Sequence, residues 1–304
     1  MKKITGYVRD YFIGIDKRIF FLSALFIGIS IFCNYHFHLN RQASRMSDPL
    51  QYLYWYCVFL LAFSLPYLLY TLFGIHKPFI HRGFLILFFI APLIFSWKMV
   101  YDIDFVFSDN VAGNAYWNQV VYWPFKLVVI TLCIYLLWAV TRKDDESFYG
   151  LNTKNFNARP YLAMLLIMVP LIAAASTQRD FLAMYPKIKN IAFLKGVHGH
   201  GWYKLLYELS YASDFFSIEL FFRGFLVLAF VRWFGRDAIL PMACFYCTIH
   251  FGKPLGECIS SFFGGIILGV VTYHTRTIFG GLMVHLGIAW LMELGGYLGH
   301  ELLL

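Results

Sequence analysis

Long apolar runs alternate with short polar segments along almost the whole chain. A helix needs about 20 residues to cross a hydrocarbon core of about 30 Å. Runs of this kind cover residues 17–34, 51–74, 83–97, 119–141, 160–177, 205–234, 256–273 and 278–299, and a shorter one covers 238–250. The pattern predicts an all-α fold, a polytopic integral membrane helical bundle of about eight to nine transmembrane helices.

Composition supports the membrane assignment. Hydrophobic residues make up 60% of the chain, aromatic residues 20% and charged residues only 14%, far from the values of soluble domains. The formal net charge of +8 lies in short polar segments beside the apolar runs, so we expect the lipid bilayer as a partner and no nucleic acid. The first run lacks a small-residue cleavage site, which predicts a retained helix and not a removable signal peptide.

The distribution of Lys and Arg predicts the orientation. Eleven of these residues lie in the first, third and fifth polar segments, and three lie in the second and fourth. Positive charge marks the cytoplasmic side, so we expect the cytoplasmic (inner) membrane with the N-terminus in the cytoplasm. The next segment carries four basic residues and breaks the alternation, which leaves the topology of the second half open.

Two regions differ in polarity. Residues 1–158 are predicted to form N-terminal transmembrane helices with few internal polar groups, and residues 159–304 to form a second domain where polar residues concentrate. A polar, helix-breaking connector running from Arg142 to Pro160 separates them. Lys126 is one turn inside its span and is interpreted as a side chain that extends along the helix to the membrane surface.

The six cysteines lie in or beside apolar runs, so no disulfide framework is predicted. Cys244, Cys247 and His250 are spaced by three residues, which allows a metal site to be considered. Steps of three on one helix spread side chains over about 120°, which disfavours shared coordination of one ion. We therefore expect no metal and no cofactor.

Polar residues inside the later apolar runs are the candidate chemistry. Glu219 and Arg223 are four residues apart, and His250 and His285 follow on later helices. A charged side chain in hydrocarbon costs about 2.5–3.5 kcal/mol on insertion scales, so such residues indicate a functional site. A buried ion pair with a purely structural role would also explain Glu219 and Arg223. Two histidines and a carboxylate on three helices favour one polar cavity.

Two features of the last helices concern packing. Gly265 and Gly269 form a small-xxx-small motif, which predicts close approach of a neighbouring helix. Glu293 shares a helix face with His285 and Ala289, and it could enter the cavity or cap the helix near the membrane surface. We favour the surface position, because Gly295 and Gly296 directly after it suggest the end of the helix.

The sequence resembles the CAAX prenyl protease and bacteriocin-processing (Rce1-like, Abi) superfamily of intramembrane proteases. The family motif Glu-Glu-x-x-x-Arg corresponds to residues 218–223, with Glu219 and Arg223 conserved in type and Ile218 in the first position. The motif Phe-x-x-x-His corresponds to residues 246–250, with Tyr246 first and His250 last. The motif His-x-x-x-Asn/Asp corresponds to His285 through Ala289. The resemblance covers about residues 160–300.

The resemblance implies a helical bundle that hydrolyses a peptide bond near the terminus of a membrane-associated peptide or protein, which is reached from the membrane. In such a family a glutamate assisted by a histidine activates water, and a second histidine and an asparagine stabilise the oxyanion. The implied catalytic residues are Glu219, His250, His285 and Arg223. Two histidines and one glutamate could also hold zinc with an open position, although zinc is not favoured.

Two departures leave the function open between two hypotheses. Ile218 replaces the glutamate that chiefly activates water, and Ala289 replaces the oxyanion asparagine. Asp214, one helical turn before Ile218, could supply a carboxylate to the same space. The first hypothesis is a divergent intramembrane endopeptidase (a hydrolase). The second is a catalytically inactive pseudoprotease that acts as a membrane binding, chaperone-like or immunity protein.

Overall fold

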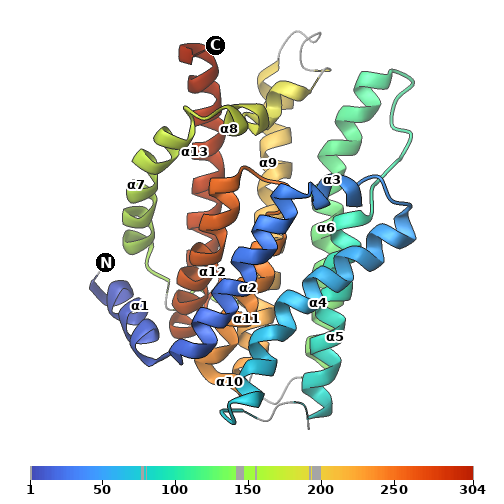
Figure 1. Ribbon diagram of the computed structural model, residues 1–304. Helices are drawn as coiled ribbons and strands as arrows, with labels where there is room; N and C mark the ends of the chain where they lie inside the picture. The colour runs from blue at the N-terminus through green and yellow to red at the C-terminus, as the bar shows by residue number, and fades with distance from the viewer. Residues whose placement is uncertain are drawn as a thin grey trace. The chain divides into compact units, whose positions relative to one another are not determined.

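The fold is all-helical (Figure 1). The computed structural model describes residues 2–76, 79, 81–141, 147–154, 156–191, 193 and 200–303, and the regular elements among these residues are helices, with no strand. Seven of the described helices are long and apolar enough to cross a membrane: α2 (Lys17–His36), α4 (Asp48–Leu72), α5 (Arg82–Val100), α6 (Val111–Thr141), α7 (Ala158–Ala175), α12 (Leu255–Thr275) and α13 (Phe279–Leu303). The predicted all-α polytopic membrane bundle is confirmed.

Other described elements lie between these helices or before them. They are α1 (Lys2–Gly14), α3 (Leu39–Ala43), α8 (Arg179–Met184), the 3₁₀ helix η2 (Lys187–Asn190), α9 (His200–Glu219), the π-helix η4 (Leu220–Ala229), α10 (Val231–Phe234), the 3₁₀ helix η5 (Gly235–Ala238) and α11 (Ile239–Thr248). The seven long helices match seven of the predicted apolar runs. The other two runs, 205–234 and 238–250, correspond to α9 with η4 and to α11.

Two compact packing units interleave along the chain. Unit 1 contains residues 1–101, 133–156 and 220–281, and unit 2 contains residues 102–132, 157–219 and 282–304. Because these units are defined by packing, the division at residues 158 and 159 stays a prediction of the sequence. Within the connector, residues 142–146 lie outside the described part of the chain.

Helix α11 forms the centre of unit 1. It packs against α2, α4, α12 and η4, and all ten of its residues are buried. Aromatic rings fill the space around it, with Phe245 of α11 contacting Phe59 and Phe63 of α4 at centroid distances of 4.8 and 5.8 Å. Such ring pairs stabilise a core beyond the area they bury.

Glycines allow α12 to approach α11 closely. A Cβ on Gly269 would lie 2.7 Å from Met242 Cε and 2.9 Å from Ile239 Cγ2. A Cβ on Gly265 would lie 3.2 Å from the Tyr246 ring and 3.3 Å from Ala243. The predicted role of this motif in close helix packing is confirmed.

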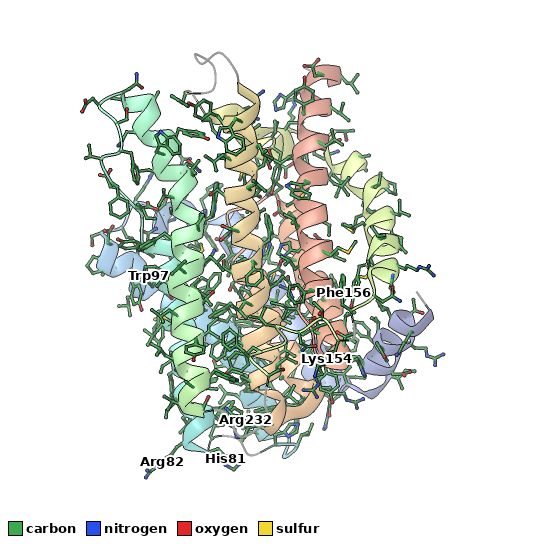
Figure 2. All side chains as sticks on the ribbon, turned by 180° about the vertical axis from the view of Figure 1, so that it is seen from behind. His81, Arg82, Trp97, Lys154, Phe156 and Arg232 are labelled. Atoms are coloured by element: carbon green, nitrogen blue, oxygen red, sulfur yellow. The ribbon has the colours of Figure 1, made fainter. Side chains whose placement is uncertain are left out.

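One end of unit 1 brings several chain segments together. Arg236 donates to the carbonyl of Gly14 at the end of α1 over 2.7 Å, and Arg232 donates to the carbonyl of Thr141 at the end of α6 over 2.8 Å. Figure 2 shows Arg232 at the same end as His81 and Arg82, where α5 begins. The segment after α4 also reaches this end, because His76 Nε2 lies 2.9 Å from Asp237 Oδ2.

In unit 2 the first part of α6 runs beside α9 in the same direction. The Tyr116 hydroxyl donates to the Tyr203 carbonyl over 2.8 Å, and the Ser210 hydroxyl donates to the Val120 carbonyl over 2.5 Å. An aromatic cluster joins the two helices to α13, and its buried members are Tyr116, Val120, Trp123, Tyr207, Tyr211, Phe215 and Ala289.

The expected end of the last helix just after Glu293 is wrong. Helix α13 continues to Leu303, and Glu293 is only 9% exposed. Its carboxylate oxygens lie 3.0 and 2.9 Å from the Lys187 backbone nitrogen, at the start of η2. Gly296 does not end the helix. It makes room for the backbone of Tyr185 and Pro186, which would lie 2.6 Å from a Cβ at this position.

Candidate functional site

Glu219 and His285 form a direct pair in unit 2. Glu219 is the last residue of α9 and is 0% exposed. His285 Nδ1 lies 3.0 Å from Glu219 Oε1. A carboxylate accepts hydrogen bonds, so Nδ1 carries the proton and donates it, and Nε2 becomes the basic nitrogen of the ring. A carboxylate that orients a histidine in this way is a recurring arrangement at sites of general base catalysis.

Apolar rings form the immediate surroundings of this pair. The Phe215 ring stands edge-on to His285 at a centroid distance of 4.8 Å, and Tyr211 stands edge-on to Phe215 at 5.0 Å. In such surroundings an electrostatic interaction is stronger than in water. The His285 side chain keeps 16% of its surface exposed, so part of the ring is accessible.

Ile218 and Ala289, the two residues that depart from the family motifs, lie in apolar surroundings. Ile218 is 7% exposed and belongs to the buried core. Ala289 is 4% exposed and packs in the aromatic cluster of α6, α9 and α13. Neither side chain can donate or accept a hydrogen bond, so neither position supplies the base or the oxyanion donor that the family motifs would place there.

Asp214 takes part in a separate local arrangement. Its side chain is half-buried, and the Ser217 hydroxyl lies 3.3 Å from its Oδ1 and 2.8 Å from its backbone carbonyl. The pair between Glu219 and His285 identifies Glu219 as a carboxylate in contact with a predicted catalytic histidine.

Arg223, Tyr246 and His250 form a second group, in unit 1. The guanidinium carbon of Arg223 lies 4.1 Å from the centroid of the Tyr246 ring, and Arg223 is fully buried. His250 Nδ1 donates to the Tyr246 carbonyl over 3.0 Å, and its ring stands edge-on to Tyr246 at 4.7 Å. The donated Nδ1 proton again makes Nε2 the basic nitrogen. Tyr246, the aromatic residue of the second motif, thus supports both an arginine and a histidine.

Helix winding changes between the two parts of the first motif. Regular α-helix ends at Glu219, and residues 220–229 wind as a π-helix with i→i+5 hydrogen bonds. In an α-helix each residue turns about 100° from the one before, but this value does not hold from Glu219 to Arg223. Counting residues in the sequence therefore could not show whether these two side chains lie on one face of the helix. Short π-helical segments are frequent at functional sites.

Lys126 differs from its predicted position. Its side chain is 0% exposed, so it is buried inside the protein and does not extend along the helix to solvent. The ammonium group lies 3.7 Å from the centroid of the Tyr122 ring, one turn earlier on α6. A desolvated cation over an aromatic face gains about 2 kcal/mol, which helps to offset burial. The spacing of Tyr122 and Lys126 by four residues was the signal in the sequence for this contact.

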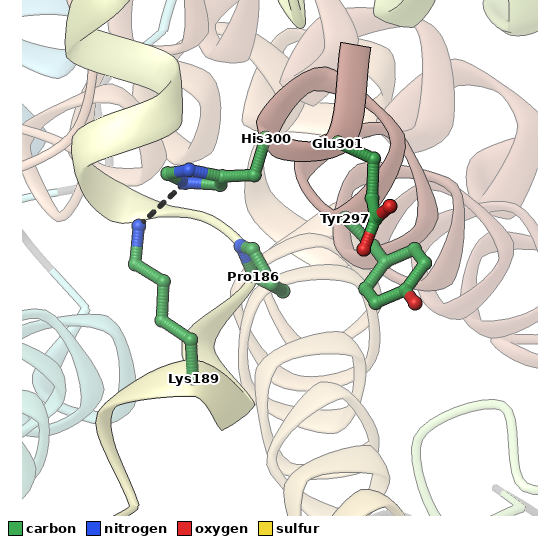
Figure 3. A pocket seen from close by; sticks show the side chains of 5 residues that line it. All are labelled: Pro186, Lys189, Tyr297, His300 and Glu301. Atoms are coloured by element: carbon green, nitrogen blue, oxygen red, sulfur yellow. Dashed lines mark hydrogen bonds between the residues drawn. The ribbon is translucent and has the colours of Figure 1, made fainter. Parts of the chain in front are cut away.

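Unit 2 contains an open pocket of about 500 Å³ (Figure 3), and the lysine that lines it has a structural role. It is lined by Pro186, Lys189, Tyr297, His300 and Glu301. The Lys189 ammonium lies 2.5 Å from the Leu182 carbonyl, 3.3 Å from the Tyr185 carbonyl and 2.8 Å from His300 Nε2. His300 Nε2 itself lies 2.8 Å from the Leu182 carbonyl and 3.2 Å from the Tyr185 carbonyl, so the lysine and the histidine together cap the end of α8. Burial lowers the pKa of Lys189, while the charge of Glu293 opposes this shift.

Among the described residues, no three His, Cys, Asp or Glu side chains converge in a way that could hold a metal ion. Cys244 and Cys247 are buried in α11 as free thiols. The pair of Glu219 and His285 provides one carboxylate and one imidazole, fewer protein ligands than a catalytic zinc site requires.

Comparison with known families confirms the resemblance found in the motifs. Residues 205–291 match the family model of the type II CAAX prenyl endopeptidase Rce1-like proteins. This stretch includes Glu219, Arg223, His250 and His285. No curated protein and no solved structure gave a significant match. The match supports an integral membrane protein with a protease domain of the CAAX type in general.

Proposed function

We propose that the chain is an intramembrane endopeptidase that hydrolyses a peptide bond of a membrane-associated peptide or protein. The observation that carries the proposal is the 3.0 Å contact between His285 Nδ1 and Glu219 Oε1 inside the region that matches the protease family. A buried carboxylate and a histidine held in one tautomer are suited to activating water.

In the proposed mechanism, His285 Nε2 takes a proton from water as the oxygen attacks the peptide carbonyl. The carboxylate of Glu219 stabilises the imidazolium that forms, and His285 then passes the proton to the departing amine. The proton taken from water thus leaves with the amine product, and the remaining hydroxyl becomes part of the new carboxylate. The proposal requires no metal.

His250 and Arg223 are proposed to contribute to the same activity, as the family motifs imply. The bond from His250 Nδ1 to the Tyr246 carbonyl fixes the tautomer of this histidine. In its protonated form the second ring nitrogen is a donor suited to a developing oxyanion. Arg223 is proposed to position Tyr246 through its contact with the ring.

Cleavage of a membrane-peptide library by the purified protein in lipid nanodiscs tests this function. We expect E219Q and H285A each to lower the cleavage rate by about 10²–10⁴-fold, because each removes part of the general base. H250A is expected to lower it as well. The matched control is E301Q, which changes an exposed carboxylate on α13. Cleavage that survives E219Q and H285A at the wild-type rate, or that a chelator abolishes, would contradict the proposal.

A pseudoprotease is the second candidate, and the apolar surroundings of Ile218 and Ala289 favour it. Under this alternative the protein binds a membrane peptide or protein without hydrolysing it. The double variant I218E/A289N restores the family residues. If wild type does not cleave and the double variant does, the natural chain is a pseudoprotease that has retained the catalytic framework.

For the orientation, we propose a cytoplasmic N-terminus in the inner membrane. The supporting observation is that one end of unit 1 carries Arg232 and Arg82, and that Arg236 of the same unit contacts the end of α1 at Gly14. A concentration of basic residues at one end is typical of the cytoplasmic side. An N-terminal tag that is digested by protease in inside-out vesicles but protected in intact cells would agree with this orientation, and the reverse pattern would reject it.

A further inference from the structure

Cys247 and Cys258 are adjacent in unit 1, although eleven positions separate them in the sequence. Cys247 Sγ lies 3.4 Å from the Cys258 carbonyl, and Cys258 Sγ lies 4.0 Å from the Cys247 carbonyl. Each thiol therefore lies against the backbone carbonyl of the other cysteine. Cys247 is near the end of α11 and Cys258 is in the first turn of α12, so both lie beside the turn of residues 249–254.

The close packing of α11 and α12 explains why these two cysteines are adjacent. A disulfide requires Cα atoms about 4.4–6.8 Å apart, closer than most pairs of packed helices bring two residues. Here Gly265 and Gly269 remove the side chains that would separate the helices. Cys244, one turn before Cys247 on α11 and equally buried, provides a comparison on the same helix.

We propose that Cys247 and Cys258 are a site of oxidative modification, where a disulfide forms between α11 and α12. Two S–H bonds break and one S–S bond forms, and two protons and two electrons pass to an oxidant. A lipid-soluble quinone, which becomes a hydroquinone, is the class of oxidant that reaches thiols inside a membrane. The crosslink fixes both ends of the turn of residues 249–254, which contains His250, because Cys247 and Cys258 lie on either side of it. The inference does not depend on the proposed peptidase activity.

Oxidation of the purified full-length protein with diamide and glutathione, followed by peptide mapping, tests the site. Diamide accepts the same two hydrogen atoms and becomes a hydrazine. The concentration of diamide is raised until the exposed thiol of Cys57 carries a glutathione adduct, which shows that the reagent has acted on the protein. We expect one crosslinked peptide pair containing Cys247 and Cys258, which a reductant separates.

Variants distinguish this pair from other thiols. C247S and C258S are each expected to abolish the crosslinked peptide, and C244S is expected to retain it. Because the first measurement uses wild type, it gives a result even if a serine variant fails to fold. Modification of Cys57 while Cys247 and Cys258 stay reduced would overturn the proposal, and so would a crosslink that joins a different pair.

Discussion

The guanidinium of Arg223 lies 4.1 Å from the centroid of the Tyr246 ring, and both residues are buried in unit 1. A buried cation is costly unless its surroundings compensate it, and an aromatic face is one such compensation. The same tyrosine provides the carbonyl that accepts the bond from His250. The second motif therefore stabilises the arginine of the first motif in addition to carrying a histidine.

Substitution of Tyr246 tests this role of the ring. Y246F keeps an aromatic face, and the family motif itself has Phe at this position, so we expect Y246F to retain most of the stability. Y246L removes the face and is expected to cost about 2 kcal/mol or more. Thermal unfolding in detergent measures the difference. Equal loss in the two variants would show that the hydroxyl, and not the ring, is the important group.

Two glycines of α12 are expected to differ in how well they tolerate a side chain. G269A would bring a Cβ to 2.7 Å from Met242 Cε and 2.9 Å from Ile239 Cγ2, so we expect it to lower stability by about 1–3 kcal/mol through overpacking. G264A is the matched control on the same helix, because a Cβ there meets nothing within 4 Å. It is expected to be neutral or to stabilise by up to about 1 kcal/mol, since Ala favours helix over Gly. Unfolding midpoints that fail to separate the two variants would contradict the close packing.

Glu293 is expected to hold the segment that follows α8. E293A removes both carboxylate oxygens that contact the Lys187 N–H group, at a cost of about 1–3 kcal/mol. E293Q keeps one acceptor oxygen and is expected to cost less. Limited proteolysis between residues 179 and 191 measures local opening, and E301A, an exposed position on the same helix, serves as the control. Unchanged cleavage of this segment in E293A would reject the anchoring role.

Asp16 makes the start of α2 sensitive to pH. Its side chain accepts from the backbone nitrogens of Arg18 and Ile19, and the Arg18 guanidinium lies 2.7 Å from its Oδ2. The hydrogen bond from the Arg18 side chain is the main cause that lowers the pKa of Asp16, with smaller contributions from the two backbone bonds. The folded state thus holds the proton less tightly than the unfolded state. The stabilisation is complete above the unfolded pKa of about 3.9 and is lost as the pH falls through the lower folded value.

We therefore expect D16A to cost about 1 kcal/mol at neutral pH and to approach wild type below about pH 4. Unfolding midpoints over a pH series measure this convergence. D10A, which changes an exposed aspartate beside Arg9, is expected to have little effect at any pH. A D16A deficit that stays constant down to pH 2 would show that Asp16 does not act through its charge.

The length of the apolar runs was enough to predict the spanning helices. A helix in lipid must make all its backbone hydrogen bonds within itself, and it needs about 20 residues to cross the hydrocarbon core. The runs 17–34 and 256–273 correspond closely to α2 and α12. The Gly265 and Gly269 motif also predicted the close approach of a neighbouring helix, because such an approach depends only on small side chains at that spacing. These features are local, and one segment contains all the information needed to recognise them.

The sequence by itself also identified the residues of the candidate site, because a carboxylate, an arginine and two histidines are rare inside apolar runs and their motifs have a fixed order. Only the tertiary structure decided their partners. It paired His285 with Glu219, placed Tyr246 in contact with Arg223 and His250, buried Lys126 against Tyr122, and brought Glu293 to the Lys187 backbone N–H group. Pairing of side chains from segments far apart depends on how helices pack and on where α-helix gives way to π-helix at residue 220, and local spacing contains neither.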